Sequence, residues 1–136
     1  MNTLALQVGQ TASRSNTLTA EHVRLYAEIT GDRNPLHFDA AFAARTPFAR
    51  LVVHGGLITG ILNALVAEDM PGPGTVFTGM NLRFIRPVYV GDTITATAEV
   101  LEVHASKPSC RLAVRIARDN GEIVLTGETW CYQFSA

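Results

Sequence analysis

The chain is short of the features that identify several large classes of protein. Its formal net charge is −1, so it has no basic excess for binding nucleic acid. Its most apolar run, Leu57 to Ala67, contains polar residues and is too short to span a bilayer. Residues 1–6 lack the charged start and long apolar stretch of a signal peptide. We therefore expect a soluble, cytoplasmic protein that binds neither nucleic acid nor membrane.

Cysteine and lysine are also scarce. The two cysteines, Cys110 and Cys131, have neither zinc-site spacing nor a CxxC redox motif, so we expect no bound metal. Of the 11 basic residues, only Lys107 is lysine and the rest are arginine. Arginine suits planar and phosphate-bearing partners, but genomic composition explains the same bias. The excess of arginine over lysine therefore does not indicate a function.

What the chain does have is enough apolar content for a core. It contains 136 residues, of which 47% are hydrophobic and 17% charged, with no internal repeat and no low-complexity segment. A chain of this length and composition folds as a globular unit without disulfides or structural metal. We expect a single domain over residues 1–136.

The first segments are expected to be a strand and a helix. Weak alternation of apolar residues predicts a strand over Val8 to Leu18. Thr19 is a good N-cap for the helix that follows, and Gly31 stands where a C-terminal glycine ends a helix. A loop over residues 32–37 comes next, because the residue before Pro35 is pushed away from helical backbone angles.

The most apolar helix lies near the middle of the chain. A short helix over residues 40–44 precedes it. The long helix is expected from Gly55 to Asp69, and Pro71 to Gly74 ends it. Because apolar and small residues cover nearly all of its faces, this helix should be buried.

The second half of the chain is expected to form strands. A curled antiparallel sheet wrapped around the long helix fits this order of elements, which makes the fold α+β. Such a sheet has exposed edges, and pairing with a second copy commonly covers them. The expected strands run over Thr75 to Val88, as one strand or a broken pair, and over Thr93 to His104, about 111–118, and Ile123 to Phe134.

One hairpin makes a specific prediction about the cysteines. Asp119-Asn120-Gly121-Glu122 predicts a type I′ turn with a two-residue loop. Paired residue numbers then sum to 241, so Cys110 faces Cys131 at a non-hydrogen-bonded position of the ladder. We expect two packed, reduced thiols, and a β-bulge before them would break the register.

The segment Asp32-Arg33-Asn34-Pro35-Leu36-His37 is the most informative for chemistry. A carboxylate and an imidazole flank an Asn-Pro turn, so both can point to one water molecule. Asp32 can act as a base, and a neutral His37 can donate to or accept from the same water. Asp32 is also a common turn-forming residue and His37 a possible structural one. The pair alone leaves both interpretations open.

His54-Gly55-Gly56 is the second polar feature, at the start of the long helix. The first N–H groups of a helix have no partner within the helix, and the helix dipole adds positive charge there. Gly55 is therefore a candidate oxyanion site for a carbonyl that gains negative charge. A plain flexible helix entry is the alternative, and we expect His54 to cap or orient the loop.

Three motifs carry a resemblance to a known family. They are Asp32-x-Asn34-Pro35-x-His37, Val53-His54-Gly55 and Arg86-Pro87-Val88-x-x-Gly91-Asp92, with Val8-Gly9-Gln10 near the start. In these motifs the chain resembles the MaoC-like, (R)-specific enoyl-CoA hydratases of the hot-dog fold. The first motif is the overhang signature of hydratases within that fold. The resemblance covers most of the chain and implies a sheet curled around the central helix, with a hydratase overhang segment.

The resemblance implies a role for each motif residue. Asp32 and His37 would activate the water that adds to C3 of a trans-2-enoyl-CoA, and the same pair would deliver a proton to C2. The Gly55 N–H would bind the thioester oxygen, and Asn34 would shape the turn beside the substrate. This syn addition gives an (R)-3-hydroxyacyl-CoA and needs no cofactor other than the coenzyme A of the substrate. Which residue is the formal base stays open.

Two positions depart from the family pattern. Many relatives have methionine where Gly56 stands, and some have a small hydroxyl residue in place of Asn63. Both positions are candidates for lining the acyl pocket, so the preferred chain length stays open. Arg83, Arg86 and Lys107 are candidates for the phosphates of coenzyme A, with a solvated strand face as the alternative.

Other functions of the same fold also stay open. A thioesterase would need a carboxylate or nucleophile near the middle of the long helix, which offers only Thr59 and Asn63. A non-catalytic subunit would have no need of Asp32, His37 and Gly55. Branched or dicarboxylic acyl-CoA and acyl-carrier-protein thioesters are alternative substrates. The resemblance also implies a homodimer that acts on β-oxidation intermediates or supplies polyhydroxyalkanoate monomers.

Overall fold

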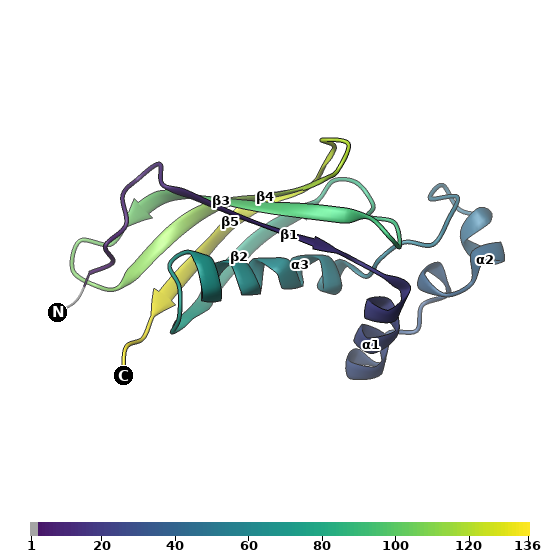
Figure 1. Cartoon of the computed structure of the whole chain (residues 1–136), viewed down its shortest axis with the longest axis horizontal. Coiled ribbons are helices and arrows are strands. Elements are labelled where there is room, and N and C mark those ends of the chain that lie inside the picture. The colour runs from purple at the N-terminus through teal and green to yellow at the C-terminus, as the bar shows by residue number, and fades with distance from the viewer. Residues whose placement is uncertain (1–2) are drawn as a thin grey trace.

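A curled antiparallel sheet wraps around one long helix (Figure 1). The computed structural model describes residues 3–136; Met1 and Asn2, part of the segment in which no signal peptide is expected, lie outside the described residues. Five strands stand in the order β1-β3-β4-β5-β2, with every neighbouring pair antiparallel. They are β1 (Thr11–Thr17), β2 (Thr75–Phe84), β3 (Thr93–Val103), β4 (Ser109–Arg118) and β5 (Ile123–Gln133).

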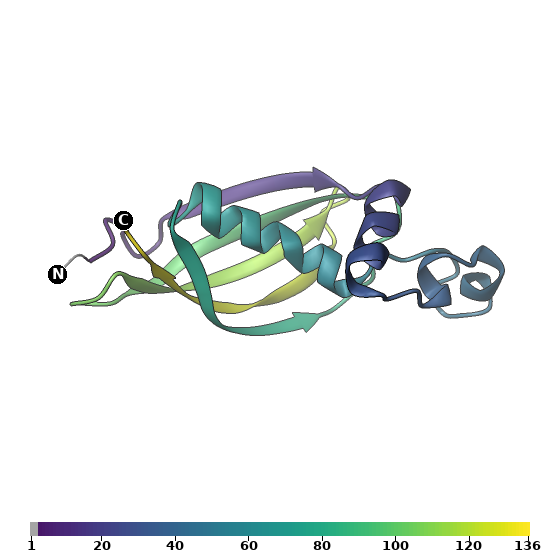
Figure 2. The same ribbon diagram turned by 90° about the horizontal axis from the view of Figure 1, so that it is seen from below.

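The long helix runs along the concave face of the sheet, and the other helices lie beyond one end of it (Figures 1 and 2). Within residues 3–136, none of the helices combines the length and apolarity needed to cross a membrane. The helical elements are α1 (Ala20–Thr30), a 3₁₀ turn η1 (Pro35–His37), α2 (Ala40–Ala44), α3 (Gly55–Ala64) and a π-helical turn η2 (Leu65–Asp69).

Both predicted ends of α1 are confirmed. The Thr19 hydroxyl accepts a hydrogen bond from the His22 N–H, and His22 Nδ1 accepts one from the Thr19 N–H, both at 3.2 Å. At the other end Gly31 is the C-cap in the left-handed region, with φ 81°, where glycine has no Cβ clash. The loop that carries Asp32 therefore leaves α1 in a fixed direction.

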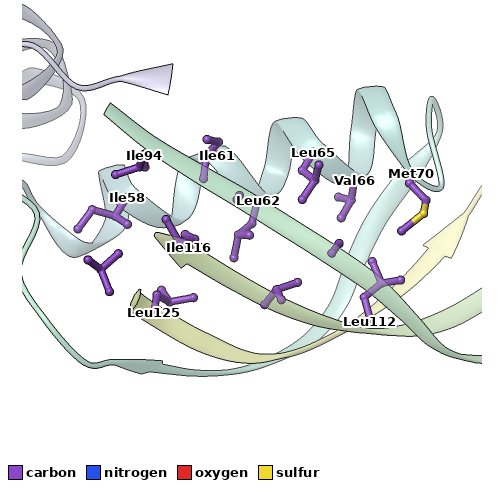
Figure 3. Close-up of a cluster of buried hydrophobic side chains, with 14 of the residues drawn as sticks. Ile58, Ile61, Leu62, Leu65, Val66, Met70, Ile94, Leu112, Ile116 and Leu125 are labelled. Carbon is purple, nitrogen blue, oxygen red and sulfur yellow. The ribbon is translucent and has the colours of Figure 1, made fainter. Parts of the chain in front are cut away.

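The long helix is buried, as its composition predicts. Ile58, Leu62 and Leu65 are 3% exposed or less and pack against the sheet, where Ile116 and Leu125 are fully buried (Figure 3). Full burial of such a side chain is worth about 1.5–3 kcal/mol. The same contacts hold the helix start, and with it Gly55, at a fixed place over the end of the sheet.

Of the two expectations for Thr75 to Val88, one strand or a broken pair, the structure has one strand, which ends before the last residues of that range. The ladder ends at Phe84, the N–H groups of Ile85 and Arg86 both turn to the Val124 carbonyl, and Pro87 has no N–H to continue it. Val88 instead accepts a hydrogen bond from the Val53 N–H at 2.8 Å. This contact ties the segment before α3 to the sheet. The first strand is also shorter than expected, starting at Thr11 instead of Val8.

The predicted pairing of the cysteines is confirmed, but the predicted turn is wrong. Cys110 stands opposite Cys131. The loop has three residues, 119–121, because the Gly121 N–H donates to the Arg118 carbonyl and Gly121 alone among them has positive φ. A type I′ turn would need positive φ at Asn120 as well. A bulge between Ile116 and Ala117 then shifts the register back. The longer loop and the bulge cancel each other.

The expected non-hydrogen-bonded position of the cysteines is also wrong. The Gln133 N–H donates to the Pro108 carbonyl at 2.8 Å, and hydrogen-bonded pairs recur at every second position of an antiparallel ladder. Cys110 and Cys131 therefore form a hydrogen-bonded pair, in which Cα atoms are farther apart. Both thiols are free and buried. The hydrogen bond with Cys110 and burial together raise the pKa of Cys131, which keeps its thiol protonated.

Candidate active site

The loop after α1 is shaped by two successive side-chain turns. Asp32 Oδ1 accepts a hydrogen bond from the Asn34 N–H at 3.2 Å, and Asn34 Oδ1 accepts one from the Leu36 N–H at 3.1 Å. Pro35 then begins the turn η1, where its missing N–H costs nothing. These contacts bend the chain so that the carboxylate of Asp32 stays exposed while the ring of His37 turns inward.

His37 is held as a neutral imidazole with one nitrogen free. Its Nδ1 lies 2.7 Å from the Val52 carbonyl oxygen, which can only accept, so Nδ1 carries the proton. Nε2 then keeps its lone pair, and among residues 3–136 no group bonds to it. The ring is 9% exposed, and this burial lowers the pKa of His37 below its ordinary value. His37 is therefore suited to accept a proton near neutral pH.

His54 lies against His37 but is bonded differently. The ring centroids are 3.8 Å apart, at an interplanar angle of 31°. His54 Nε2 lies 3.0 Å from the backbone carbonyl oxygen of Asp32, so Nε2 donates. The ring is 1% exposed and makes no capping hydrogen bond to α3. Of the two expected roles for His54, capping is not observed, whereas the bond to Asp32 is of the orienting kind.

Asp32, His37 and His54 each bring one ligand-type atom within 4.8 Å of the others. Such a cluster raises the question of a metal ion. Each histidine donates one ring N–H to a backbone carbonyl, which leaves one nitrogen of each ring with a lone pair. These two nitrogens and the exposed carboxylate of Asp32 are the groups that proton transfer requires.

Gly55 and Gly56 open α3 with N–H groups that are free to bind a ligand. The N–H groups of Leu57 and Ile58 both turn back to the His54 carbonyl, whereas no group among residues 3–136 accepts from Gly55 or Gly56. Two unpaired donors at the positive end of a helix attract a developing oxyanion. The candidate site thus places these donors directly after His54 in the chain.

The two glycines face different neighbours. A Cβ on Gly55 would lie 3.1 Å from the Phe84 ring, beside a pocket of about 270 Å³ that also includes Arg86. A Cβ on Gly56 would lie only 1.7 Å from the hydroxyl of Tyr26. Tyr26 therefore occupies the space that a side chain at position 56 would take. Gly56 is a contact of Tyr26, which the sequence did not indicate.

The remaining predicted residues are spread more widely. Asn34 lies within the turn, and Asn63 is exposed eight residues along α3 from Gly55, about 12 Å at 1.5 Å per residue. Arg83 is exposed on β2, next to the Phe84 that contacts Gly55. Lys107 is in the β3–β4 connection, at the end of the sheet away from α1 and α2 (Figure 1). It does not belong to this site.

Sequence reasoning missed Tyr26 and Val52. Tyr26 belongs to none of the motifs in the sequence, but its ring lies 4.8 Å from that of His54. Val52 contributes a backbone carbonyl, and side-chain patterns carry no signal for such a role. Both contacts join segments far apart in the chain.

The chain matches the family model described as MaoC like domain over residues 4–119. It is 41% identical over 128 residues to an (R)-specific enoyl-CoA hydratase of Aeromonas caviae, covering 94% of this chain and 96% of that protein. It is 39% identical over 123 residues to a 3-hydroxybutyryl-CoA dehydratase of Methylorubrum extorquens, covering 90% of this chain and 78% of the relative.

Solved structures are similar over nearly the whole chain. The (R)-hydratase from A. caviae involved in PHA biosynthesis superposes with a TM-score of 0.91 at 39% identity, covering 96% of this chain and 98% of that one. The R-hydratase PhaJ1 from Pseudomonas aeruginosa, in its unliganded form, gives a TM-score of 0.88 at 39% identity, covering 96% and 84%. The predicted hot-dog fold is thereby confirmed, and the chain belongs to the MaoC-like domain family.

Proposed function

We propose that the protein catalyses the reversible (R)-specific hydration of trans-2-enoyl-CoA to (R)-3-hydroxyacyl-CoA. The observation that carries the proposal is a neutral His37 with a free Nε2, close to the exposed carboxylate of Asp32, next to a helix that starts with unpaired N–H donors. An acid/base pair and an oxyanion site are the two parts that adding water to an enoyl thioester requires. Relatives named (R)-specific enoyl-CoA hydratase support it.

The reaction divides between the two parts of the site. Asp32 and His37 take a proton from water as its oxygen bonds to C3, and the electron pair of the C2–C3 double bond moves toward the thioester carbonyl. The Gly55 N–H donates to that oxygen while it is negatively charged, a contact worth roughly 3–4 kcal/mol in comparable sites. The acid/base pair then returns a proton to C2. Water is consumed, no electron carrier takes part, and the thioester bond stays intact.

A thioesterase reaction is less well supported. It would need a carboxylate or nucleophile near the middle of α3, where Thr59 donates its hydroxyl to the Gly56 carbonyl and Asn63 is exposed. Asp69, in η2 beyond the end of α3, is bonded to Arg14 at 2.9 Å. None of these three groups forms an acid/base pair like that of Asp32 and His37.

The working unit in this proposal is a homodimer in the cytoplasm. The edge strand β2 leaves Val76, Met80 and Phe84 36% exposed or more, and no further strand within residues 3–136 pairs with its outer side. An uncovered apolar edge of this kind favours pairing with a second copy. The (R)-3-hydroxyacyl-CoA product would suit polyhydroxyalkanoate synthesis, the process named for the A. caviae structure.

Two readouts on crotonyl-CoA test the proposal. Purified protein should reduce the absorbance of the enoyl thioester while releasing no free thiol, and chiral chromatography should identify the (R)-3-hydroxybutyryl product. Release of thiol without hydration would favour the thioesterase. Inactivity over a range of chain lengths would remove the hydratase function and leave a binding role.

A further inference from the structure

The third sequence motif, residues 86–92, takes no part in the reaction steps above, but it contacts the chain just before α3. Val52 stands opposite Tyr89 in an isolated antiparallel bridge outside the five-stranded sheet. Backbone hydrogen bonds of 2.8 and 3.2 Å lie on either side of this pair. The pair itself is therefore non-hydrogen-bonded, and the N–H and C=O of Val52 point away from Tyr89.

Both outward-pointing groups of Val52 bind the loop that carries His37. The Val52 N–H donates to the Leu36 carbonyl at 3.1 Å, and the Val52 carbonyl accepts from His37 Nδ1 at 2.7 Å. Val52 is 6% exposed, which shields these contacts from water. The bridge to Tyr89 sets the place of the Val52 carbonyl, and that carbonyl decides which nitrogen of His37 carries the proton.

The side chain of Tyr89 is held by two arginines. The Arg50 guanidinium lies 3.8 Å from the centroid of the Tyr89 ring, and the Arg118 guanidinium lies 5.1 Å from it. Both distances are within the range of cation–π attraction. Arg50 stands two residues before Val52, so its contact with Tyr89 joins the same two segments as the backbone bridge does.

Asp92 holds the backbone of Tyr89. Its Oδ2 accepts hydrogen bonds from the Tyr89 N–H and from Arg118 Nε, each at 2.8 Å. Gly91, with φ 97°, makes the tight turn that brings Asp92 back to Tyr89. The Arg118 and Asp92 side chains are 15% and 20% exposed, so salt screens their ion pair less than one on the open surface. One carboxylate thus holds both the Tyr89 backbone and an arginine beside its ring.

We propose that Tyr89 and Asp92 are positioning residues for the hydration, which hold the Val52 carbonyl against His37 and thereby keep its Nε2 free. The proposal rests on the hydratase function above. An imidazole in water favours the proton on Nε2, where it could not take a proton from the attacking water. The Val52 carbonyl reverses this preference because it offers Nδ1 only an acceptor. A looser bridge lets the Nε2–H form return, and activity falls with the fraction of competent molecules.

Two pairs of variants separate positioning from general stabilisation. Tyr89→Ala removes the ring, whereas Tyr89→Phe keeps both the ring that Arg50 contacts and the N–H that Asp92 binds. Asp92→Ala removes the acceptor of the Tyr89 N–H, whereas Asp92→Asn keeps an oxygen there. Glu128→Ala is the matched control, since Glu128 forms an ion pair with Arg111 on β4 but lies outside the bridge.

The ¹⁵N NMR signals of the histidine rings report the tautomer of His37, with His37→Gln to assign them. The parent should show a protonated Nδ1 and an unprotonated Nε2 at neutral pH. Tyr89→Ala and Asp92→Ala should populate the Nε2–H form and lower kcat for crotonyl-CoA by about tenfold or more, with little change in KM. Tyr89→Phe and Glu128→Ala should keep the parent spectrum and activity, and Asp92→Asn should lose less than Asp92→Ala.

His54 is an internal control for the NMR comparison. Its Nε2 donates to the Asp32 carbonyl and not to the bridge, so its tautomer should stay the same in every variant. An unchanged His37 tautomer in folded Tyr89→Ala and Asp92→Ala would overturn the proposal. A loss of kcat without a change of tautomer would overturn it as well, because the contacts would then serve stability alone.

Folding and activity are checked separately from the tautomer. If thermal unfolding shows that Tyr89→Ala does not fold, Arg50→Ala replaces it, since Arg50 is exposed, and should shift the His37 tautomer in the same direction. An unshifted tautomer in that variant would overturn the proposal. If the parent does not hydrate crotonyl-CoA, the hydratase function fails, and the NMR comparison still decides whether the bridge sets the tautomer of His37.

Discussion

His37 and His54 are two buried, stacked imidazoles that differ in how their nitrogens are used. His37 donates from Nδ1 to the Val52 carbonyl and keeps Nε2 free, whereas His54 donates from Nε2 to the Asp32 carbonyl. His54 Nδ1 is buried without a partner. The bonded nitrogen fixes the tautomer of each ring, so His37 keeps its lone pair on Nε2, whereas His54 keeps its own on the buried Nδ1. Residue type and burial alone would not separate a catalytic histidine from a positioning one.

The largest expected effect follows from removing the free nitrogen. His37→Gln should lower kcat for crotonyl-CoA by about 100-fold or more, the usual scale of acid–base catalysis. Steady-state kinetics measures the loss, and circular dichroism with thermal unfolding checks that the variant folds. Near-normal turnover would remove His37 from the chemistry and make the two histidines alike.

Replacing the carboxylate tests the other half of the pair. Asp32→Asn keeps an oxygen that can accept from the Asn34 N–H, so the turn should survive while the charge is lost. We expect kcat to fall by about 100-fold or more. Asp39→Asn is a suitable control, since Asp39 caps the Phe42 N–H and is not part of the cluster. A similar loss in both variants would point to a structural effect.

A smaller effect is expected at His54. Glutamine at this position can still donate to the Asp32 carbonyl, whereas alanine cannot, so His54→Gln should lose about tenfold in kcat and His54→Ala more. The rescue by glutamine separates a positioning role from proton transfer. A loss with His54→Gln as large as that with His37→Gln would break the distinction between the two rings.

The smallest expected effect of the contact between His37 and His54 is on the pH dependence of activity. Burial lowers the pKa of His37, and a charge on His54 would lower it further. Activity should therefore persist below the ordinary histidine value of about 6.5 and be lost as the pH falls through the lowered pKa. Because the folded state binds this proton less readily than the unfolded state, stability also decreases as the pH falls from the ordinary value of about 6.5 to the lowered pKa. His54→Gln should move the acid limb of kcat/KM back toward the ordinary value, and an unchanged limb would contradict the coupling.

Local signals in the sequence predicted most of the fold. The caps at Thr19 and Gly31, the apolar faces of the long helix and the alternation of the strands each depend on neighbouring residues, and each is confirmed. The hairpin shows what local signals cannot predict. The longer loop and the bulge together keep the predicted cysteine pair, but the backbone hydrogen bonds differ from those of the predicted two-residue turn. Pairing can be right while the turn that produces it is wrong.

In the candidate site, too, residues within local motifs could be predicted, whereas contacts between separate segments could not. Asp32, His37 and Gly55 could be predicted because each belongs to a short motif. Tyr26 and Val52 could not, because their contacts with His54 and His37 depend on how separate segments meet. The contact between Gly56 and Tyr26 also joins separate segments, so the sequence did not indicate it.

The most direct test of the central claim is the stereochemistry of hydration in D₂O. One acid/base pair on one face of the substrate should add the hydroxyl group at C3 and deuterium at C2 to the same side of crotonyl-CoA. NMR of the product should show (R)-3-hydroxybutyryl-CoA with a single deuterium at C2, in the syn arrangement. An (S) product, an anti arrangement or random deuterium at C2 would contradict a site in which Asp32 and His37 act together.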